Sequence, residues 1–589
     1  MFPKYKWKDA QADETTVRSL ARALGMTPPV ARVLVARGVA TPEAADAFLR
    51  PELKKHLGDP LGFPGVRGAA ERLWSAVRAG REIVVFGDFD ADGVAAAVVL
   101  VTALRKIGGA AEVFLPVRET EGYGLSFAAL ERCFRERGRA PGLLVTVDCG
   151  IGSAAEVAHL NTLGVEVIIT DHHEPSGELP PAAVIVNPRL GATPGTEHLC
   201  GAGVAFKVAH ALATMGKAHG WYRGGPLGGD LLVPVGLATV ADIVPLTGEN
   251  RLLVWSALKH WGRFASSGLR ALLSRSSQQT VPDAYTFGFV LGPRINAAGR
   301  MDSAMVAYEL LTTPDKDRAA ELAAKLEGFN GRRRGVEERI VQAALHQCGL
   351  DVAGAAFDGA AAVVGRDGPH VGEAGWHPGV IGIVASRLCE AVGRPAAVVS
   401  FDEAGVGRGS VRACEGYDAL RALAAAGEAL ARYGGHARAA GFHVKPGAFG
   451  LFKRLFCAAC ASQAAAGGGV RTLTVDGWLQ PQQATLELYR EQQQLAPFGH
   501  GNPAPRWGLR DVTVKEARPM GAAGEHMQCT FERDGRLLPR GVWFRSGGAV
   551  EAVRTSGGRF DVVFELRENT FGGEASVELQ MVDIAPAQR

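Results

Sequence analysis

Three short segments, each apolar at its start and acidic at its end, constrain the fold of this chain most strongly. Their sequences are IVVFGDFDADG (83–93), LLVTVDCG (143–150) and VEVIITDHH (165–173). An apolar run of about four to six residues, rich in β-branched side chains, is typical of a strand buried on both faces of a parallel sheet. The first two segments continue directly into helix-favouring stretches rich in glycine, alanine and serine. The pattern therefore predicts an α/β fold with a parallel sheet.

The same segments place their polar residues at one edge of the predicted sheet. Ligands of open α/β sheets bind beyond the carboxyl ends of the strands, so the acids and imidazoles should converge there. Several carboxylates can share one crevice at neutral pH only with cations or protons between them, and divalent metal is the simplest solution. The residues concerned are Asp88, Asp90, Asp92, Asp148, Asp171, His172 and His173.

The first motif places three aspartates, Asp88, Asp90 and Asp92, at alternate positions. In an extended segment they would share one face, whereas in a tight turn they would surround an ion. Carboxylate oxygens suit Mg²⁺ or Mn²⁺, and an added imidazole ligand shifts the preference towards Mn²⁺. Two ions about 3.5–4 Å apart would hold the attacking and leaving oxygens at phosphorus in line. Taken singly, each aspartate could equally cap a helix or lie in a solvated loop.

His172 and His173 are adjacent at a predicted strand end, so only one of them can easily face the crevice as a ligand. The other could donate a hydrogen bond to a phosphoryl oxygen or to the leaving group. Asp242, in the apolar run GLATVADIVPL, is a weaker candidate ligand on its own.

Three glycine-rich stretches allow two interpretations each. CGAGVAF (200–206) resembles half of a phosphate-binding loop, and a tight turn into a helix explains it as well. GSVRACEG (409–416) and YGGHARAAG (433–441) could form an anion cradle around Ser410, Arg412 and His436, or they could be glycine turns in a packed domain.

A chain of 589 residues is too long for one core. Strand–helix alternation between about 82 and 188 predicts a doubly wound sheet. The charged segment 314–347 is predicted to be helical, with interruptions at its three glycines, and several short strands in 505–586 predict a small barrel such as an OB-fold. We expect an N-terminal helical segment (1–60), a catalytic α/β domain (61–313), a connecting helix (314–350), a smaller α/β domain (351–466), a linker at 464–470 and an OB-like domain (471–589).

Net charge and cysteine content exclude few classes of function. The formal net charge of +3 does not indicate nucleic-acid binding, so any basic surface must be local. The nine cysteines form no regular framework and suit a reducing cytoplasm, and the CxxC at Cys457 and Cys460 lies in an apolar helical stretch that indicates packing. No run of about 18 apolar residues is present that would span a membrane.

The ordered motifs GDFDADG, VTVDCG, TDHH, ATVADIVPL and GGHARAAGF resemble the DHH phosphoesterase superfamily with its DHHA1 domain. Longer stretches are similar to the RecJ-like exonucleases within it, and together they cover about 37–586. These stretches are RETEGYGLS (118–126), LCGAGVAFKVA (199–209), LGPRINAAGRMD (291–302), GWHPGVIGIVASRL (375–388) and APFGHGNPAPRW (496–507).

The resemblance implies a metal-dependent 5′→3′ exonuclease that degrades single-stranded DNA to 5′-mononucleotides in DNA repair and recombination, with two Mn²⁺ or Mg²⁺ ions. It implies that His173 contacts the scissile phosphate. Phe86 stands where several relatives have a histidine, so substrate or water would have to complete the second metal site. The implied metal ligands are Asp90, Asp92, Asp148, His172 and Asp242, with Asp88 in the same motif.

The resemblance also implies a DNA path between the DHH and DHHA1 domains, completed by the OB-like domain. Trp507, Phe531 and Trp543 could stack on bases there, or they could equally form the core of the barrel. The implied partners are single-stranded DNA with a 5′ end, a single-strand-binding protein and a RecQ-type helicase, for a cytoplasmic monomer without membrane contact. The implied phosphate and substrate contacts are Arg118, Arg294, Asn296, Arg300, Trp376, His377, Ser410, Arg412 and His436.

Three other functions fit parts of the sequence. A DHH phosphodiesterase acting on short oligonucleotides, cyclic dinucleotides or polyphosphate usually lacks the long N-terminal segment and the terminal barrel. A non-catalytic replication scaffold of the Cdc45 kind has lost metal-site acids, which this chain keeps. A redox Rossmann enzyme requires a complete GxGxxG after a strand, and none is present.

Overall fold

The computed structural model describes residues 4–587 apart from 176, 221–228, 277–280, 351–358, 367–375, 467–470, 556–557 and 571–572. The chain forms two compact units, each built from segments that are far apart in the sequence. The predicted linker at 464–470 lies partly outside the described residues. One unit comprises Arg50–Gly335 and Pro497–Pro503, and the other comprises Met1–Leu49, Val336–Ala496 and Ala504–Arg589.

A parallel sheet of five strands forms the centre of the Arg50–Gly335 unit, as the sequence predicts. The strand order is β3-β2-β4-β5-β6. Every residue of β2 and β4 is buried, which accounts for their continuous apolar runs. The strands are β2 (Ile83–Gly87), β3 (Ala111–Phe114), β4 (Leu143–Val147), β5 (Glu166–Thr170) and β6 (Val184–Val186).

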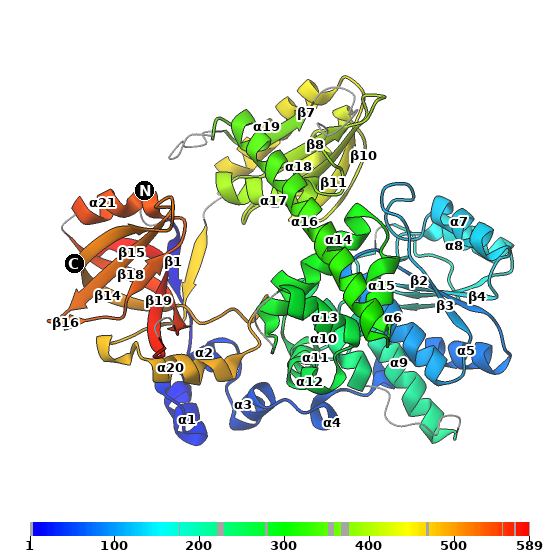
Figure 1. The fold of residues 1–589 in the computed structure, drawn as a ribbon, viewed down its shortest axis with the longest axis horizontal. Helices are drawn as coiled ribbons and strands as arrows, with labels where there is room; N and C mark the ends of the chain where they lie inside the picture. Colours follow the sequence, from blue (N-terminus) through cyan, green and yellow to red (C-terminus); the bar gives the residue numbers. More distant parts are fainter. Residues whose placement is uncertain are drawn as a thin grey trace. The chain divides into compact units, whose positions relative to one another are not determined.

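Helices cover both faces of this sheet, so the sheet is doubly wound (Figure 1). Alternate residues of β2 enter two different cores. Ile83 and Val85 pack with α5, α6 and α9 on one face, whereas Val84 and Phe86 pack with α7 and α8 on the other. These helices are α5 (Val66–Arg78), α6 (Ala91–Lys106), α7 (Phe127–Arg137), α8 (Ala154–Thr162) and α9 (Gly201–Ala218).

The strand order creates a crevice between the ends of β2 and β4. The chain leaves β2 towards β3 on one side and returns to β4 on the other side, so β2 and β4 are neighbours at the point where the winding reverses. Open α/β sheets bind ligands at such a point. Asp88 directly follows β2 and Asp148 directly follows β4, so both aspartates lie at the mouth of this crevice.

The rest of the Arg50–Gly335 unit consists mainly of helices. Pro234 lies inside α10, and the helix ends directly before Asp242. A π-helical turn, η2 (Thr286–Leu291), leads into α14. The helices are α4 (Leu53–His56), α10 (Gly229–Ala241), α11 (Gly248–Lys259), α12 (Trp261–Phe264), α13 (Ser267–Ser276), α14 (Gly292–Met301) and α15 (Met305–Thr312).

The connecting helix α16 (Lys316–Gln347) is continuous, so the predicted interruptions at Gly328, Gly331 and Gly335 are wrong. A glycine inside a helix costs about 1 kcal/mol relative to alanine, and packing at both ends of α16 offsets this cost. The end before the glycines buries Ala319, Leu322, Ala323, Leu326 and Phe329, and the end after them buries Ile340, Val341 and Ala344 in a separate core.

The other unit contains the predicted smaller α/β domain. Its sheet has the order β10-β11-β9-β8-β7, in which only β7 and β8 are parallel. The strands are β7 (Ala362–Arg366), β8 (Ala396–Phe401), β9 (Gly407–Arg412), β10 (Leu430–Gly435) and β11 (Ala439–Val444). The helices are α17 (Ile381–Val392), α18 (Ala419–Ala425) and α19 (Phe449–Ala465).

A closed barrel of five strands follows, as predicted for an OB-like domain. The order β14-β18-β19-β17-β15 is closed by pairing of β14 with β15. Trp507, Phe531 and Trp543 are 0%, 0% and 4% exposed, so the barrel-core interpretation of these aromatic residues is confirmed. The elements are β13 (Gly477–Trp478), α20 (Leu486–Gln492), β14 (Trp507–Met520), β15 (His526–Arg533), β16 (Arg536–Leu537), β17 (Gly541–Trp543), α21 (Val550–Thr555), β18 (Arg559–Asn569) and β19 (Ser576–Pro586).

The N-terminal residues belong to the same unit as the barrel. Strand β1 pairs in parallel with β12, and Asp583 of the barrel accepts a hydrogen bond of 2.8 Å from the Trp7 indole. Cys460 is buried in the core under α19, which confirms the packing interpretation of the CxxC. The elements are β1 (Lys6–Asp9), α1 (Glu14–Leu24), α2 (Pro28–Ala36), α3 (Pro42–Leu49) and β12 (Thr472–Val475).

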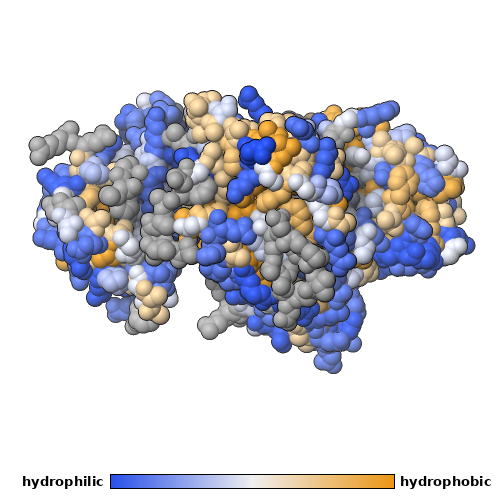
Figure 2. Space-filling view, turned by 90° about the horizontal axis from the view of Figure 1, so that it is seen from above, coloured by the Kyte–Doolittle hydropathy of each residue, from blue (hydrophilic) through white to orange (hydrophobic). Residues whose placement is uncertain are grey.

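The surface is of mixed polarity. On the face drawn in Figure 2, hydrophobic patches alternate with hydrophilic ones over short stretches. Among the described residues, no helix combines the length and the apolar character needed to cross a membrane.

Candidate metal centre

Asp90 and Asp92 are positioned by the first turn of α6. Asp90 is the N-cap of the helix, and its Oδ1 atom accepts hydrogen bonds from the backbone N–H groups of Asp92 (2.9 Å) and Gly93 (3.0 Å). A Cβ atom on Gly93 would lie 2.6 Å from the backbone nitrogen of Asp88, so only glycine lets the turn approach the end of β2 this closely. The motif DxDxDG therefore forms a tight turn that gathers its three carboxylates.

The start of α9 binds the Asp92 carboxylate. The backbone N–H groups of Gly201 and Ala202 donate to Asp92 Oδ2 (2.7 Å) and Oδ1 (2.8 Å), respectively. The positive end of a helix dipole favours such an anion. Of the two interpretations of CGAGVAF, the tight turn into a helix is confirmed, because the buried backbone amides of this turn hold a protein carboxylate.

Asp148 has an unusual backbone conformation. Its φ angle is +60°, in the left-handed region that few residues other than glycine, asparagine and aspartate adopt. Gly201 packs directly against its side chain, and a Cβ atom on Gly201 would lie 2.7 Å from Asp148 Oδ1. The position of the Asp148 carboxylate is therefore fixed by its own strained backbone and by contact with Gly201 at the start of α9. Strained backbone of this kind is common at functional sites.

His172 joins the carboxylates through its Nε2 atom. This atom lies 3.1 Å from Asp148 Oδ1, 3.7 Å from Asp92 Oδ2 and 3.7 Å from Asp242 Oδ2. Burial, reinforced by the neighbouring His173, lowers the pKa of His172 to about 3, so the ring is neutral at physiological pH. A neutral imidazole is the form that binds metal.

The buried carboxylates resist ionisation in the absence of a cation. Burial and the neighbouring Asp90 carboxylate raise the pKa of Asp92 to about 6. The same two causes raise the pKa of Asp88 well above its ordinary range. Burial and the charge of Asp92 likewise raise the pKa values of Asp148 and Asp242. The site therefore concentrates negative charge that needs either protons or a metal ion.

The orphaned atoms of the site show that a divalent ion fits here. Asp88 Oδ1, Asp148 Oδ1 and His172 Nε2 are buried, and each lacks a hydrogen-bond partner among the described residues. Hard carboxylate oxygens with one imidazole suit Mn²⁺ or Mg²⁺. Three groups have ligand atoms within 4.8 Å of one another: Asp92, His172 and Asp242; Asp148, His172 and His173; and Asp88, Asp90 and Asp148.

Phe86 lies on the face of β2 that packs against α7 and α8. It is fully buried and stacks on Phe114, with ring centroids 5.3 Å apart. It therefore offers nothing to a second metal ion. Asp88 belongs to the third ligand group, so carboxylates of the chain itself provide a second set of ligands next to the first.

His173 is held between Asp171 and Tyr123. Its Nδ1 atom lies 2.7 Å from Asp171 Oδ1, and its Nε2 atom lies 3.1 Å from the Tyr123 hydroxyl. Burial disfavours the charged ring, but the hydrogen bond and the charge of Asp171 outweigh this effect and raise the pKa of His173 to about 9. His173 is therefore a cationic hydrogen-bond donor at neutral pH, unlike the adjacent His172.

Asp171 organises this arrangement without facing the metal ligands. Its Oδ1 atom also accepts from the backbone N–H of His172 (2.7 Å), and its Oδ2 atom accepts from that of Ile151 (3.0 Å). Burial opposes its ionisation, but the hydrogen bond from His173 prevails and holds the pKa of Asp171 below its ordinary value. Asp171 is an anchor for both histidines.

The predicted phosphate contacts of this unit are only partly gathered near the acids. Asn296 Oδ1 accepts a hydrogen bond of 2.7 Å from the Ala91 N–H and so ties α14 to the start of α6. Arg118 lies over the Phe89 ring, 5.1 Å from its centroid. Arg294 is buried in a two-point ion pair with Glu327 (2.6 and 3.2 Å), and Arg300 lies in the last turn of α14.

The other predicted contacts belong to the second unit. Arg412 donates to Ser410 Oγ (3.0 Å), and both side chains lie over the first turn of α17, where a Cβ on Gly382 would lie 3.2 Å from the guanidinium. This arrangement combines a cation, a hydroxyl and a helix N-terminus, as an anion cradle requires. Trp376 is buried in the core beneath α17, the ring of His377 accepts from the Gly379 N–H, and His436 is exposed at the end of β10.

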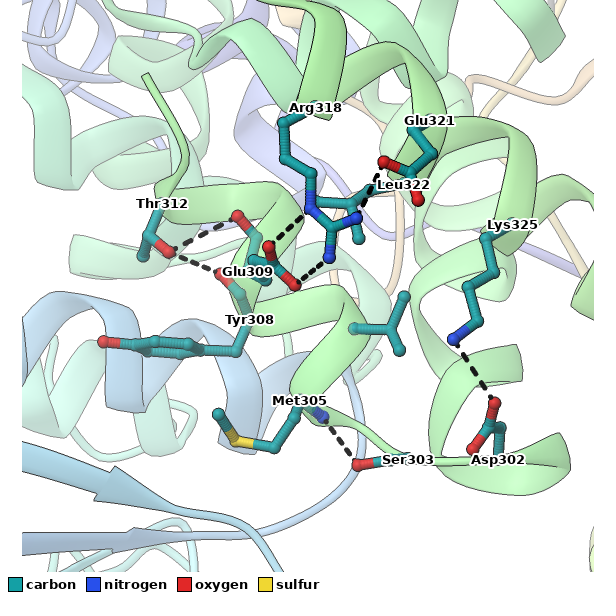
Figure 3. A pocket seen from close by; sticks show the side chains of 11 residues that line it. Asp302, Ser303, Met305, Tyr308, Glu309, Thr312, Arg318, Glu321, Leu322 and Lys325 are labelled. Carbon is teal, nitrogen blue, oxygen red and sulfur yellow. Dashed lines mark hydrogen bonds and ion pairs between the residues drawn. The ribbon is translucent and has the colours of Figure 1, made fainter. Parts of the chain in front are cut away.

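A pocket between α15 and α16 lies apart from the candidate site. Its volume is about 430 Å³. Arg318 pairs there with Glu309 (2.6 Å) and Glu321 (2.7 Å), and Lys325 lies 3.6 Å from Asp302 (Figure 3). Each charged side chain that lines it, three carboxylates and two cations, has an ion-pair partner in the pocket, so its described residues offer no free cation to a nucleic-acid phosphate.

Three groups of the site escaped prediction from the sequence. The first group is the pair of backbone amides of Gly201 and Ala202, and the second is the Tyr123 hydroxyl. The third is the side-chain amide of Asn187, which donates to the His173 carbonyl (3.0 Å). Tyr123 lies in the stretch RETEGYGLS, and that was the only signal for it. The stretch CGAGVAF was a signal for the backbone amides, but it did not indicate that they bind Asp92, and Asn187 had no signal.

Models of three known domains and several known proteins match this chain. The model of the DHH family N-terminal domain matches 82–222, that of the DHHA1 domain matches 359–462, and that of the RecJ OB domain matches 475–583. The single-stranded-DNA-specific exonuclease RecJ of Escherichia coli (strain K12) is 35% identical over 582 residues, which is 95% of this chain and 96% of that protein. The RecJ of Thermus thermophilus is 36% identical over 567 residues, covering 95% and 77%.

Solved structures give the same result. The crystal structure of RecJ in complex with Mn²⁺ from Thermus thermophilus matches with a TM-score of 0.82 and 32% identity, over 100% of this chain and 81% of that one. The Mg²⁺ complex of RecJ from the same organism matches with a TM-score of 0.77 and 30% identity, over 100% and 80%.

Proposed function

Because this chain belongs to the RecJ family of single-stranded-DNA-specific exonucleases, we propose that it is a metal-dependent exonuclease that degrades single-stranded DNA. The single observation that carries this function is the convergence of Asp148 Oδ1 and His172 Nε2. These two buried ligand atoms lie 3.1 Å apart, with further carboxylates around them and no hydrogen-bond partner among the described residues.

The residues of the site divide the chemical tasks between them. We assign Asp90, Asp92, Asp148, His172 and Asp242 to the metal, and Asp88 to a second ion. A bound divalent ion supplies an activated water and neutralises charge at the scissile phosphate. Protonated His173 donates a hydrogen bond to a phosphoryl oxygen, and Asp171 holds that ring in place and keeps it charged. For this donation, the Tyr123 hydroxyl has to yield its place at Nε2.

The number of ions is part of the proposal. Two ions of Mn²⁺ or Mg²⁺ would be held by two neighbouring ligand groups, one of Asp92, His172 and Asp242 and the other of Asp88, Asp90 and Asp148. Family membership supports the metal dependence, and the two adjacent ligand groups support the stoichiometry.

We propose 5′→3′ digestion to 5′-mononucleotides, with the 5′ end bound by the cradle of Ser410, Arg412 and the start of α17. The support is the cationic and helix-dipole character of that cradle. Arg118, Asn296, Arg300 and His436 remain candidate contacts to the DNA, whereas the pairing of Arg294 and the burial of Trp376 favour structural roles for these two.

The domain boundaries are proposed as predicted, and the matched family models at 82–222, 359–462 and 475–583 fall inside the domains 61–313, 351–466 and 471–589. A role in DNA repair and recombination, in the cytoplasm and as a monomer, completes the proposal. A single-strand-binding protein and a RecQ-type helicase are the proposed partners, and they rest on family membership alone.

The competing functions are not favoured. A non-catalytic scaffold would not need the full set of buried acids around His172. A phosphodiesterase for short oligonucleotides or cyclic dinucleotides does not account for the OB domain at 475–583.

A time course on a long single strand tests the function. The strand is labelled at its 5′ end in one reaction and at its 3′ end in another, with Mn²⁺, Mg²⁺ or EDTA present. We expect labelled mononucleotide at once from the 5′-labelled strand and progressive shortening of the 3′-labelled one, with no digestion in EDTA. Digestion in EDTA, or intact strands in both metals, would refute the proposal.

A further inference from the structure

Two exposed aromatic side chains, Tyr285 and Phe289, lie side by side on the Arg50–Gly335 unit. They are 64% and 69% exposed. Their rings stack on each other, with centroids 4.9 Å apart and planes inclined by 20°. Burial of such a side chain stabilises a fold by about 1.5–3 kcal/mol, and the fold makes little use of either ring. The pair presents flat aromatic surface to solvent.

The backbone under this pair is firmly held. The π-helical turn η2 (Thr286–Leu291) buries Phe287 and Leu291 completely. The Asp283 carboxylate accepts hydrogen bonds from the N–H (2.8 Å) and the hydroxyl (2.7 Å) of Thr286. π-Helical turns occur frequently at functional sites. The exposed rings therefore have a fixed position, which lowers the entropy cost of binding a ligand on them.

The turn packs against the end of α10, directly before the metal ligand Asp242. A Cβ atom on Gly288 would lie 3.1 Å from Val240 Cγ1, and one on Gly292 would lie 3.1 Å from Ala241 Cβ. Such close packing places the aromatic turn beside the last residues before Asp242. Ile243, which follows Asp242, is itself 69% exposed.

We propose that Tyr285 and Phe289 form a stacking platform for the unpaired bases of the DNA strand next to the metal centre. The inference rests on the proposed function, because the strand has to enter that centre. Bases stack on aromatic side chains with little regard to sequence, which suits an enzyme that digests strands of any sequence. The uncharged rings of Tyr285 and Phe289 would bind bases, whereas charged groups such as Arg412 would bind phosphates.

The test measures binding without cleavage. Oligonucleotides that carry the fluorescent base 2-aminopurine at successive positions are titrated with the protein in EDTA. With the wild-type chain we expect quenching at one or two positions, where the base stacks on a ring. The double variant Tyr285→Ala and Phe289→Ala should lose this quenching, and its dissociation constant should rise about tenfold or more, as expected for lost base stacking.

Three controls make the result specific. Phe127→Ala removes another aromatic residue that is 51% exposed, on α7 of the same unit, and should bind DNA like the wild type. Tyr285→Phe keeps the ring and should keep the quenching. Thermal unfolding of the double variant should match the wild type, because both side chains are exposed.

The failures of the two proposals are distinguishable. If the wild type digests single strands in Mn²⁺ and the double variant binds and quenches as well as the wild type, the platform is refuted and the exonuclease stands. If the double variant instead changes the oligomeric state with DNA binding intact, the surface binds protein and the inference is equally overturned. If the wild type fails to digest any strand, the function itself is wrong.

Discussion

The Nε2 atom of His172 lies 3.1 Å from the Oδ1 atom of Asp148, and neither atom has a hydrogen-bond partner among the described residues. His172 is neutral at physiological pH, because burial lowers its pKa to about 3. A carboxylate oxygen and a neutral ring nitrogen at this separation are able to bind one cation together. Two ligands at right angles around a Mg²⁺-sized ion lie roughly 3 Å apart. This pair is therefore the structural basis of the proposed activity.

Asp148→Asn should abolish digestion while the fold remains intact. Asparagine tolerates the positive φ of this position, so the change removes charge without adding strain. A metal ion contributes several kcal/mol of transition-state stabilisation, so rates in Mn²⁺ should fall roughly a thousandfold. Initial digestion rates and thermal unfolding in EDTA are the measurements. Digestion at the wild-type rate would exclude Asp148 from the site.

The alanine variant provides an informative comparison. Asp148→Ala should lose the same activity, but it should also lose about 1–2 kcal/mol of stability, because alanine lacks the local hydrogen bonds that make positive φ tolerable for aspartate and asparagine. Equal stability of the two variants would contradict the backbone argument.

Gly201→Ala should weaken metal binding without any change of a ligand. The added methyl group would lie 2.7 Å from Asp148 Oδ1 and would displace the carboxylate or the start of α9. Displaced supporting groups typically cost about 10–100-fold in metal affinity, which calorimetric titration with Mn²⁺ can measure.

Gly331→Ala is the matched control for this change. Its added methyl group meets no atom within 4 Å, and the residue lies inside helix α16. It should bind Mn²⁺ like the wild type and be more stable by up to about 1 kcal/mol. Equal loss of affinity in both variants would show that crowding at Asp148 is not the cause.

The metal-free protein should become less stable as pH rises from 7 to 9. Burial, with neighbouring carboxylates, holds the pKa values of Asp88, Asp148 and Asp242 well above the ordinary 3.8. The pKa of His173 is about 9, because the hydrogen bond and charge of Asp171 outweigh its burial. In this range folded His173 keeps a proton that the unfolded chain has lost, so stability falls as pH rises from 7 to 9, and the raised pKa values of the three carboxylates act in the same direction. His172 is neutral in both states there and contributes nothing.

Melting temperatures in EDTA and in saturating Mn²⁺ test this dependence. Mn²⁺ binds the ionised carboxylates, so it should remove the part of the decline that comes from their raised pKa values. Asp148→Asn in EDTA should also show a flatter profile. Parallel slopes with and without Mn²⁺ would show that the acids do not bind the ion.

Arg412→Ala should reduce the preference for 5′-phosphorylated strands. The guanidinium lies with Ser410 over the start of α17, where a terminal phosphate would gain charge-assisted hydrogen bonds. Such bonds contribute about 1.5–3 kcal/mol each, so KM for phosphorylated strands should rise at least about tenfold. KM for unphosphorylated strands should change little.

Arg432→Ala controls for a general loss of positive charge. Arg432 lies on β10 of the same sheet and contacts His443 (3.2 Å). It should leave the preference for the 5′ phosphate unchanged. If Arg412→Ala weakens the digestion of both kinds of strand equally, the end-anchor role is wrong.

Much of the fold could be predicted from the sequence, because apolar runs and carboxylates follow one another in a simple order. β2 and β4 are buried on both faces, so their composition shows them directly. Asp88 and Asp148 then had to meet at the edge where parallel strands end. The family resemblance added Asp242, whose apolar helix gave only a weak signal.

What could not be predicted depends on long-range packing. The amides at Gly201 that bind Asp92 and the positive φ of Asp148 arise only when α9 meets the sheet. The resemblance implied that Arg294 contacts phosphate, and its ion pair with Glu327 could not be predicted because the two residues lie on different helices. Trp507 could not be assigned to surface or core until the barrel closed around it.

Anomalous diffraction from a crystal grown with Mn²⁺ tests the central claim most directly. We expect a strong manganese peak bonded to Asp148 and His172, a second peak beside Asp88 and Asp90, and the loss of both in Asp148→Asn. A wild-type crystal without any manganese peak between these side chains would contradict the proposed metal centre.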